Sequence, residues 1–231
     1  MEENNSLIII GYEQDYKYKH IGTGFFVNTD GLIVTAGHVF ENFIKGQISL
    51  DKYYCAFPNK RSELFKIQSV YIEYENHEKQ KKNTFKDLAF VKINYNSNIF
   101  FEFETHRPKV FDKTEMYGLV NEKKERGKPG DDITFKKDET DNKVNFEEVK
   151  PHTLRVNIID KYLVDDNTKF INCITVNDGM EKGASGCPIK NMENKVIGMY
   201  FGGKNNKKYI LHSGYIKKKL HQYILKSRTK D

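Results

Sequence analysis

The chain has 231 residues and a formal net charge of +6, and 30% of its residues are charged and 13% aromatic. This length can bury a substantial core, and the composition excludes pervasive disorder. No apolar run approaches the roughly 20 residues that a membrane span needs. The apolar run at residues 7–10 follows Glu2 and Glu3 rather than the basic segment that opens a signal peptide.

The distribution of charged residues and of cysteines limits which partners and which cellular compartment are expected. Lys and Arg are interspersed with Asp and Glu, and no helix-turn-helix, zinc-finger or RNP pattern accompanies them, so neither nucleic acid nor membrane is expected as a partner. Cys55, Cys173 and Cys187 form an odd set with no CxxC pair, which indicates neither a disulfide framework nor a zinc site. We therefore expect a cytoplasmic protein without a metal or other cofactor.

The first half of the chain predicts strands around one short helical segment. Residues 22–27 and 32–35 predict a hairpin, because Asn-Thr-Asp-Gly at 28–31 ends in a glycine that accepts the positive φ of such turns. Residues 39–43 have the spacing of a single helical turn. Further strands are predicted at residues 6–11, 47–50, 52–57, 65–74 and 88–93, and the charged break at 75–86 predicts a surface loop.

The second half predicts another set of strands and a closing helix. A connector at 100–108 places a domain boundary near residue 110, which divides the chain into units of residues 1–110 and 111–231. Strands are predicted at 115–120, 154–159, 170–176, 195–201 and 209–211, and the charged stretch 121–150 predicts an exposed excursion or long hairpin. Apolar residues at helical spacing predict an amphipathic helix at about 214–227.

One serine stands in a segment suited to nucleophilic chemistry. Ser185 lies between glycines at 183 and 186, but a serine hydroxyl needs a base and oxyanion donors to act. His38 directly follows a predicted strand, and Asp87 heads an apolar strand, where a charge must be hydrogen-bonded. The other six histidines are interpreted as surface residues: His20, His77, His106, His152, His212 and His221.

Three segments, in this chain order, resemble the chymotrypsin-like (trypsin-like) serine peptidases. Residues 35–38 (Thr-Ala-Gly-His) resemble the family's Thr-Ala-Ala-His, and residues 87–90 (Asp-Leu-Ala-Phe) resemble its Asp-Ile-Ala-Leu. Residues 183–188 (Gly-Ala-Ser-Gly-Cys-Pro) resemble its Gly-Asp-Ser-Gly-Gly-Pro. Within the family, residues 196–203 (Val-Ile-Gly-Met-Tyr-Phe-Gly-Gly) are similar to a segment of bacterial glutamyl endopeptidases, and HtrA-type protease domains also look close.

The resemblance implies an all-β fold of two six-stranded antiparallel β-barrels, with the site between them and a C-terminal helix packed on the second. It assigns His38 as general base, Asp87 as the carboxylate that orients it, and Ser185 as nucleophile. The backbone N–H groups of Gly183 and Ser185 would form the oxyanion hole. The substrate-binding residues that it implies are Gly179, Met180, Tyr200, Phe201, Gly202 and Gly203.

Two positions depart from the family's pattern. Ala184 replaces an Asp that pairs with a new N-terminal amine in trypsin-type enzymes, so activation of that kind is not expected. Cys187 occupies a usual Gly or Ser position, and it is interpreted as a packed residue rather than a thiol nucleophile. The pocket residues carry no acidic side chain at the base, which favours a medium-sized apolar or uncharged side chain before the cleaved bond.

We therefore predict a serine endopeptidase that acts on protein or peptide substrates, with a narrow substrate range or control by a regulatory protein partner. Two alternatives stay open at this point. One is a catalytically silent scaffold that keeps the double barrel for partner binding. The other is a protease-chaperone of HtrA type that lacks a PDZ domain.

Overall fold

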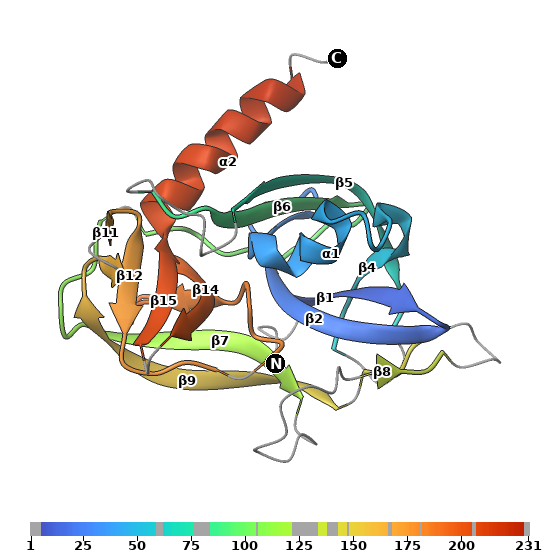
Figure 1. The fold of residues 1–231 in the computed structure, drawn as a ribbon, viewed down its shortest axis with the longest axis horizontal. Coiled ribbons are helices and arrows are strands. Elements are labelled where there is room, and N and C mark those ends of the chain that lie inside the picture. Colours follow the sequence, from blue (N-terminus) through green and yellow to red (C-terminus); the bar gives the residue numbers. More distant parts are fainter. Residues whose placement is uncertain are drawn as a thin grey trace.

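The fold is that of a computed structural model, in which two β-barrels lie side by side (Figure 1). The residues that it describes are 6–58, 62–75, 84–104, 106–121, 134–137, 143–146, 148–165, 168–180, 182–204 and 207–228. The predicted break at 75–86 and the charged stretch 121–150 therefore lie partly outside the described residues, as does His77.

The first barrel is closed by strands from residues 7–93. Its strands are β1 (Leu7–Gln14), β2 (Lys17–Phe26), β3 (Leu32–Thr35), β4 (Tyr53–Ala56), β5 (Phe65–Tyr74) and β6 (Asp87–Ile93). They run in the order β1-β4-β5-β6-β3-β2, and β1 pairs with β2 to complete the circle. The hairpin of β2 and β3 is confirmed: the side-chain oxygen of Asn28 accepts hydrogen bonds from the backbone of Asp30 and Leu32, and Gly31 has φ +73°.

The second barrel follows the same plan. Its order is β12-β15-β14-β13-β7-β9, and β9 pairs with β12 to close it. The strands are β7 (Lys113–Asn121), β9 (Val149–Asp160), β12 (Cys173–Val176), β13 (Pro188–Lys190), β14 (Val196–Lys204) and β15 (Lys207–His212), with a small separate pair of β10 (Leu163–Asp165) and β11 (Thr168–Phe170). The expected fold of two six-stranded barrels is confirmed.

Two predicted strands differ in the structure: the one at 170–176 is divided into β11 and β12 by a turn at residues 171–172, and the one at 47–50 is wrong. Residues 47–50 form no strand, because the backbone N–H groups of Gln47 and Ile48 both donate to the carbonyl of Asn42, 2.8 and 3.2 Å away. These bonds follow the short helix α1 (Glu41–Ile44) and take the donors that a strand would offer to a neighbour. Leu50–Lys52 is a short 3-10 helix instead.

Part of the charged stretch 121–150 returns to the first barrel, although Lys136, Lys137 and Asn145 are exposed as expected. Strand β8 (Thr134–Phe135) pairs with β2 in the register Tyr18 to Phe135. Val144 and Phe146 are completely buried, and the ring of Phe146 lies 6.0 Å from that of Tyr54. A segment between two strands of the second barrel therefore adds a strand and apolar side chains to the first (Figure 1).

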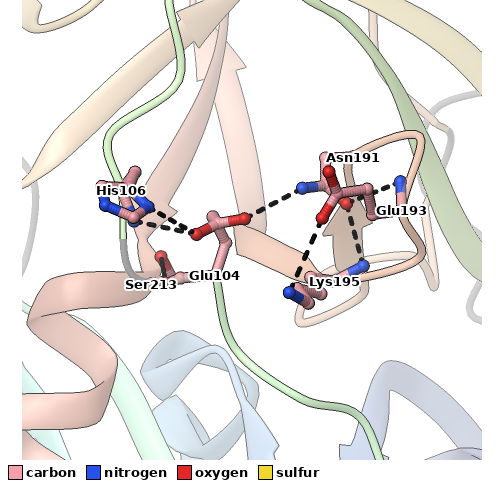
Figure 2. Close-up of polar contacts among 6 residues, drawn as sticks. All are labelled: Glu104, His106, Asn191, Glu193, Lys195 and Ser213. Atoms are coloured by element: carbon pink, nitrogen blue, oxygen red, sulfur yellow. Dashed lines mark hydrogen bonds and ion pairs between the residues drawn. The ribbon is translucent and has the colours of Figure 1, made fainter.

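The connector between the barrels is fixed by Glu104 (Figure 2). Its backbone N–H donates to the carbonyl of Val196 (2.8 Å), and its carboxylate accepts hydrogen bonds from the amide of Asn191 (3.1 Å) and the backbone N–H of His106 (3.0 Å). Its carbonyl accepts the hydroxyl of Ser213 (3.1 Å), the first residue of α2 (Ser213–Arg228). The chain passes between the barrels from Ile93 to Lys113, and the division at residue 110 into two domains stays a prediction.

Helix α2 is confirmed, but it does not pack on the second barrel alone. Ile216 near its start is completely buried. Next to it, the hydroxyl of Tyr215 donates to the carboxylate of Glu73 over 2.8 Å, and further along the helix the ring of Tyr223 lies 5.5 Å from that of Phe90. The helix therefore leaves the second barrel and crosses onto β5 and β6 of the first (Figure 1).

Candidate active site

His38 and Asp87 are brought together by two neighbouring strands of the first barrel. Strands β3 and β6 are antiparallel, with Thr35 opposite Ala89, so the end of β3 meets the start of β6. His38 lies in the 3-10 helix Gly37–Phe40 directly after β3, and Asp87 is the first residue of β6. A Cβ at Gly37 would lie 2.9 Å from the backbone nitrogen of Leu88, so a glycine is what lets the turn approach this closely.

The two side chains are joined by a double contact. The backbone N–H of His38 donates to one carboxylate oxygen of Asp87 (2.8 Å), and Nδ1 of the ring lies 2.9 Å from the other. Asp87 is completely buried, while 29% of the His38 side chain is exposed. A carboxylate at Nδ1 keeps the proton there, which leaves Nε2 free to accept a proton.

Burial of the His38 ring lowers its pKa, but the charge of Asp87, the hydrogen bond to it and the nearby charge of Glu41 raise it more, so the net shift is upward. Glu41 is the first residue of α1, one turn beyond His38, and two-thirds buried. Both carboxylates stabilise the imidazolium that forms when the ring takes up a proton.

The segment at 183–187 is a tight turn with two positive-φ glycines. Gly183 has φ +101° and Gly186 has φ +93°, conformations that side chains rarely adopt. The backbone N–H of Cys187 donates to the carbonyl of Ala184 (2.9 Å), and that of Gly186 to the carbonyl of Tyr200 on β14 (2.8 Å). Ser185 is half-buried at the centre of the turn.

This turn meets the segment that carries His38. A Cβ added at Gly22 would lie 2.6 Å from the side chain of Val39 and 3.1 Å from the carbonyl oxygen of Ser185. The backbone N–H of Thr23 donates to that same carbonyl over 2.8 Å. The structure thus packs the turn that carries Ser185 against β2, the strand next to β3, and His38 directly follows β3. This arrangement can support nucleophilic attack by a hydroxyl.

Three of the predicted pocket residues lie together. The hydroxyl of Tyr200 donates to the carbonyl of Met180 over 3.3 Å, and a Cβ added at Gly179 would lie 2.9 Å from the same hydroxyl. Burial raises the pKa of Tyr200 to about 12, and the nearby thiol of Cys187 and carboxyl of Asp178 act in the same direction. The phenol therefore stays a neutral donor.

The remaining pocket residues diverge along β14. Phe201 is buried on the other side of the strand from Tyr200, and its ring stacks on Phe85 at 4.6 Å. The pairing of β14 with β15 shifts between Tyr200 and Gly202, which has φ +133°, and Gly203 is exposed. The Phe201 side chain therefore packs just before the start of β6, because Phe85 lies two residues ahead of Asp87.

The structure also contains site residues that sequence reasoning missed. His20 is 3% exposed rather than on the surface, and a Cβ added at Gly183 would lie 2.8 Å from its ring. The alternation of Tyr18 with His20 along β2 was the available signal for its burial. The side-chain amide of Asn172 also makes two hydrogen bonds to the backbone of Phe85. Its NH₂ group donates to the Phe85 carbonyl (2.7 Å), and its oxygen accepts from the Phe85 N–H (2.8 Å).

Among the histidines interpreted as surface residues, His106, His152 and His221 are exposed. His212 is half-buried, and burial, with Arg107 nearby, lowers its pKa to about 4. Burial also raises the pKa of the Cys187 thiol, which is completely buried, and this argues against a thiolate nucleophile.

Within the described ranges, no group of three or more His, Cys, Asp or Glu side chains is placed to hold a metal ion. Across the same part of the chain, no helix combines the length and apolar character required to cross a membrane.

Comparisons with known proteins agree with this architecture. The sequence profile of the family Trypsin matches residues 6–220. No curated protein matches the sequence. Because the similar solved structures have low sequence identity, they show the fold alone.

Three such structures illustrate the likeness. The inactive form of the Rv3671c protease of M. tuberculosis is 15% identical, with a TM-score of 0.59 over 95% of this chain and 89% of its own. Neuropsin, a serine protease expressed in the limbic system of mouse brain, is 12% identical, with a TM-score of 0.60 over 96% and 95%. Human heparin binding protein is 11% identical, with a TM-score of 0.63 over 95% and 91%.

The match of the family profile over most of the chain, together with two closed six-stranded barrels, shows that the chain belongs to the trypsin family of serine proteases.

Proposed function

We propose that this chain is a serine endopeptidase in which Ser185, His38 and Asp87 form a catalytic triad. The observation that carries the proposal is the double contact of His38 with Asp87, at 2.8 and 2.9 Å, beside the turn that presents Ser185. Asp87 binds both the backbone N–H and Nδ1 of His38, which leaves Nε2 to act as the base.

In the proposed reaction, Oγ of Ser185 attacks the carbonyl carbon of a peptide bond while its proton passes to Nε2 of His38. The N–H groups of Gly183 and Ser185 donate to the oxyanion that forms. The C–N bond then breaks, His38 returns the proton to the leaving amine, and a water molecule repeats the sequence to release the acyl group.

The proposed substrate pocket accepts a medium-sized apolar or uncharged side chain. Gly179, Met180 and Tyr200 are uncharged, and the Tyr200 hydroxyl is already bonded to Met180. Gly202 and Gly203 along β14 offer backbone groups for an extended substrate, and Phe201 supports this strand from its buried side, where it stacks on Phe85. Cleavage of a peptide library only after Lys, Arg or Glu would contradict this specificity.

The setting is proposed to be intracellular, with a restricted substrate range or a regulatory protein partner. Cys55, Cys173 and Cys187 are free and buried, which suits a reducing compartment. Residues 196–203 are similar to a segment of the glutamyl endopeptidases, and we include this subgroup in the proposal. A preference for Glu is not proposed, because Tyr200 stands where those enzymes carry a histidine.

A fluorophosphonate probe tests the proposal. The folded chain is expected to form one covalent adduct, which mass spectrometry of peptides assigns to Ser185, and Ser185→Ala is expected to form none. A folded chain that is not labelled at Ser185 would instead fit a silent scaffold. New peptide termini in cells expressing the native chain, but not Ser185→Ala, would identify the substrates.

A further inference from the structure

The side chain of Thr23 lies where the two barrels and the serine-bearing turn meet. Thr23 is in β2 and completely buried. Its hydroxyl donates to the carbonyl oxygen of Gly183 over 2.8 Å and accepts a hydrogen bond from the backbone N–H of Leu119 on β7 over 3.1 Å. One hydroxyl can donate once and accept at the same time, so a single side chain links a strand of each barrel to the turn.

The backbone of Thr23 holds the same turn at a second point. Its N–H donates to the carbonyl of Ser185 (2.8 Å), and its own carbonyl accepts the hydroxyl of Thr35 (2.8 Å). A Cβ added at Gly186 would collide with this carbonyl and with the Thr35 hydroxyl. Thr23 therefore contacts the turn on both sides of Ala184, once through its side chain and once through its backbone.

The position where an ion pair would be expected is apolar. Ala184 is completely buried, and a Cβ added at Gly118 on β7 would lie 3.2 Å from the Cβ of Ala184, 3.0 Å from that of Cys187 and 2.9 Å from the sulfur of Met180. The turn is thus packed directly onto the backbone of β7. A carboxylate at position 184 would be a charge buried among these groups.

The carbonyl of Gly183 nevertheless needs a fixed direction. Glycine has the widest backbone freedom of any residue, and Gly183 sits at φ +101° with the ring of His20 against its α-carbon. Without a bond to its carbonyl, the peptide between Gly183 and Ala184 could rotate and carry the neighbouring N–H groups with it. The Thr23 hydroxyl donates to this carbonyl over 2.8 Å and so fixes its direction.

We infer that Thr23 is a positioning residue, whose hydroxyl holds the turn so that the N–H groups of Gly183 and Ser185 converge on the developing oxyanion. This inference rests on the proposed function. In this chain Ala184 cannot form a buried ion pair that would order the turn. The hydroxyl of Thr23, from the first barrel, orders the turn instead. The expected substitution effect is on the rate of the chemical step, with binding of the reagent little changed.

Thr23→Val tests the inference, because valine keeps the branched shape and removes the hydroxyl. The fluorophosphonate reaction is the readout: a bond forms between Oγ of Ser185 and phosphorus, fluoride leaves, and the hydroxyl proton passes to His38. The rate constant of labelling is expected to fall by about 10²-fold, the scale seen when an oxyanion contact is lost. The final fraction labelled should stay that of the wild type, which separates a misplaced turn from a partly unfolded sample.

Two further variants make the comparison specific. Thr23→Ser keeps the hydroxyl and is expected to recover most of the wild-type rate. Thr114→Val removes another buried hydroxyl that donates to a backbone carbonyl, that of Val156 over 3.1 Å, inside the second barrel, and is expected to leave the rate unchanged. If Thr23→Val does not fold, Thr23→Cys retains a side chain of similar size with a weak donor, and the same fall is expected.

The outcomes distinguish this inference from the proposed function. A wild-type chain that is not labelled at Ser185 overturns the proposed function and the inference with it. A labelled wild type with Thr23→Val at the same rate overturns the inference alone. So does a loss in Thr23→Val that Thr23→Ser fails to restore, or one that Thr114→Val reproduces.

Discussion

Asp87 holds His38 at two points, one on the backbone and one on the ring. Each of its carboxylate oxygens takes a different donor, at 2.8 Å from the backbone nitrogen and 2.9 Å from Nδ1. Because Asp87 is completely buried, both hydrogen bonds lie in a region of low dielectric constant, where they are stronger than in water. The orientation of the proposed base is therefore set by one residue at the head of β6.

Asp87→Asn is expected to lower the rate of fluorophosphonate labelling by about 10⁴-fold, because an amide can donate to Nδ1 and stabilise the wrong tautomer of His38. Circular dichroism should show that the variant is folded. Asp112→Asn is the matched control, since its carboxylate is exposed and accepts a local backbone N–H, from Lys109 over 2.7 Å. A fall of less than tenfold in Asp87→Asn would contradict the assigned role.

The rate of labelling should rise with pH through a pKa above the ordinary 6.5 of histidine. Burial lowers the pKa of His38, but Asp87 and Glu41 raise it more, and only the neutral ring can accept a proton. Glu41→Gln removes one of these charges and is expected to move the acid limb of the pH profile to lower pH. The shift should shrink at high salt, since the Glu41 side chain is 34% exposed.

Glu193→Gln provides the comparison for this pH profile. Glu193 is exposed and paired with Lys195 in the turn between β13 and β14, and it does not contribute to the pKa of His38. Its profile should coincide with that of the wild type. An acid limb that stays in place or rises in Glu41→Gln would rule out the proposed contribution of Glu41.

The free energy of unfolding should fall as the pH is lowered from 6.5 towards 4. Burial lowers the pKa of His20 to about 4, although the carbonyls of Gly22 and Gly183 oppose this. The folded state thus keeps the ring neutral while the unfolded chain binds a proton below 6.5, and this costs about 1.4 kcal/mol of stability per pH unit between the two values. Above 6.5 neither state binds that proton, and the contribution of His20 is constant.

His20→Phe should make the pH dependence less steep over that interval, as measured by chemical denaturation at several pH values. His212, whose pKa is also lowered to about 4, leaves part of the slope in place. Equal slopes in the wild type and His20→Phe would show that His20 is not buried as a neutral ring.

Gly186→Ala and Gly46→Ala separate backbone strain from steric conflict. Both glycines have positive φ, +93° and +70°, but a Cβ at Gly46 meets nothing within 4 Å, whereas one at Gly186 meets the Thr23 carbonyl and the Thr35 hydroxyl. Gly46→Ala should therefore lower the free energy of unfolding by about 1–2 kcal/mol. Gly186→Ala should cost at least about 2 kcal/mol more, and equal losses would contradict the packing of the turn described above.

Local features of the chain were predictable where the interactions that form them are local. The hairpin at 22–35 depends on Asn28 and Gly31, which lie within four residues of the groups they serve. The strand predicted at residues 47–50 failed because the carbonyl of Asn42, at the preceding short helix, takes the donors of Gln47 and Ile48. Nothing in the apolar pattern of those four residues reports that competition.

The candidate site divides in the same way. The motifs at residues 35–38, 87–90 and 183–188 identified His38, Asp87 and Ser185 by residue type and chain order, and the structure brings His38 and Asp87 into contact. The buried residues that support this site, His20 and Thr23, were not predicted. His20 was interpreted as a surface residue. The sequence pattern indicates no role for Thr23, because threonine is common in strands.

The sequence by itself determined the family, the two sets of strands and the chemical groups of the candidate site, because these depend on residue identity and short-range pattern. Only the tertiary structure decided how the serine-bearing turn is held, where β8 pairs and which barrel receives α2. The Thr23 hydroxyl and the Gly183 carbonyl are 160 residues apart in the chain and 2.8 Å apart in space. Such a contact exists only once both barrels have closed, since each barrel supplies one side of it.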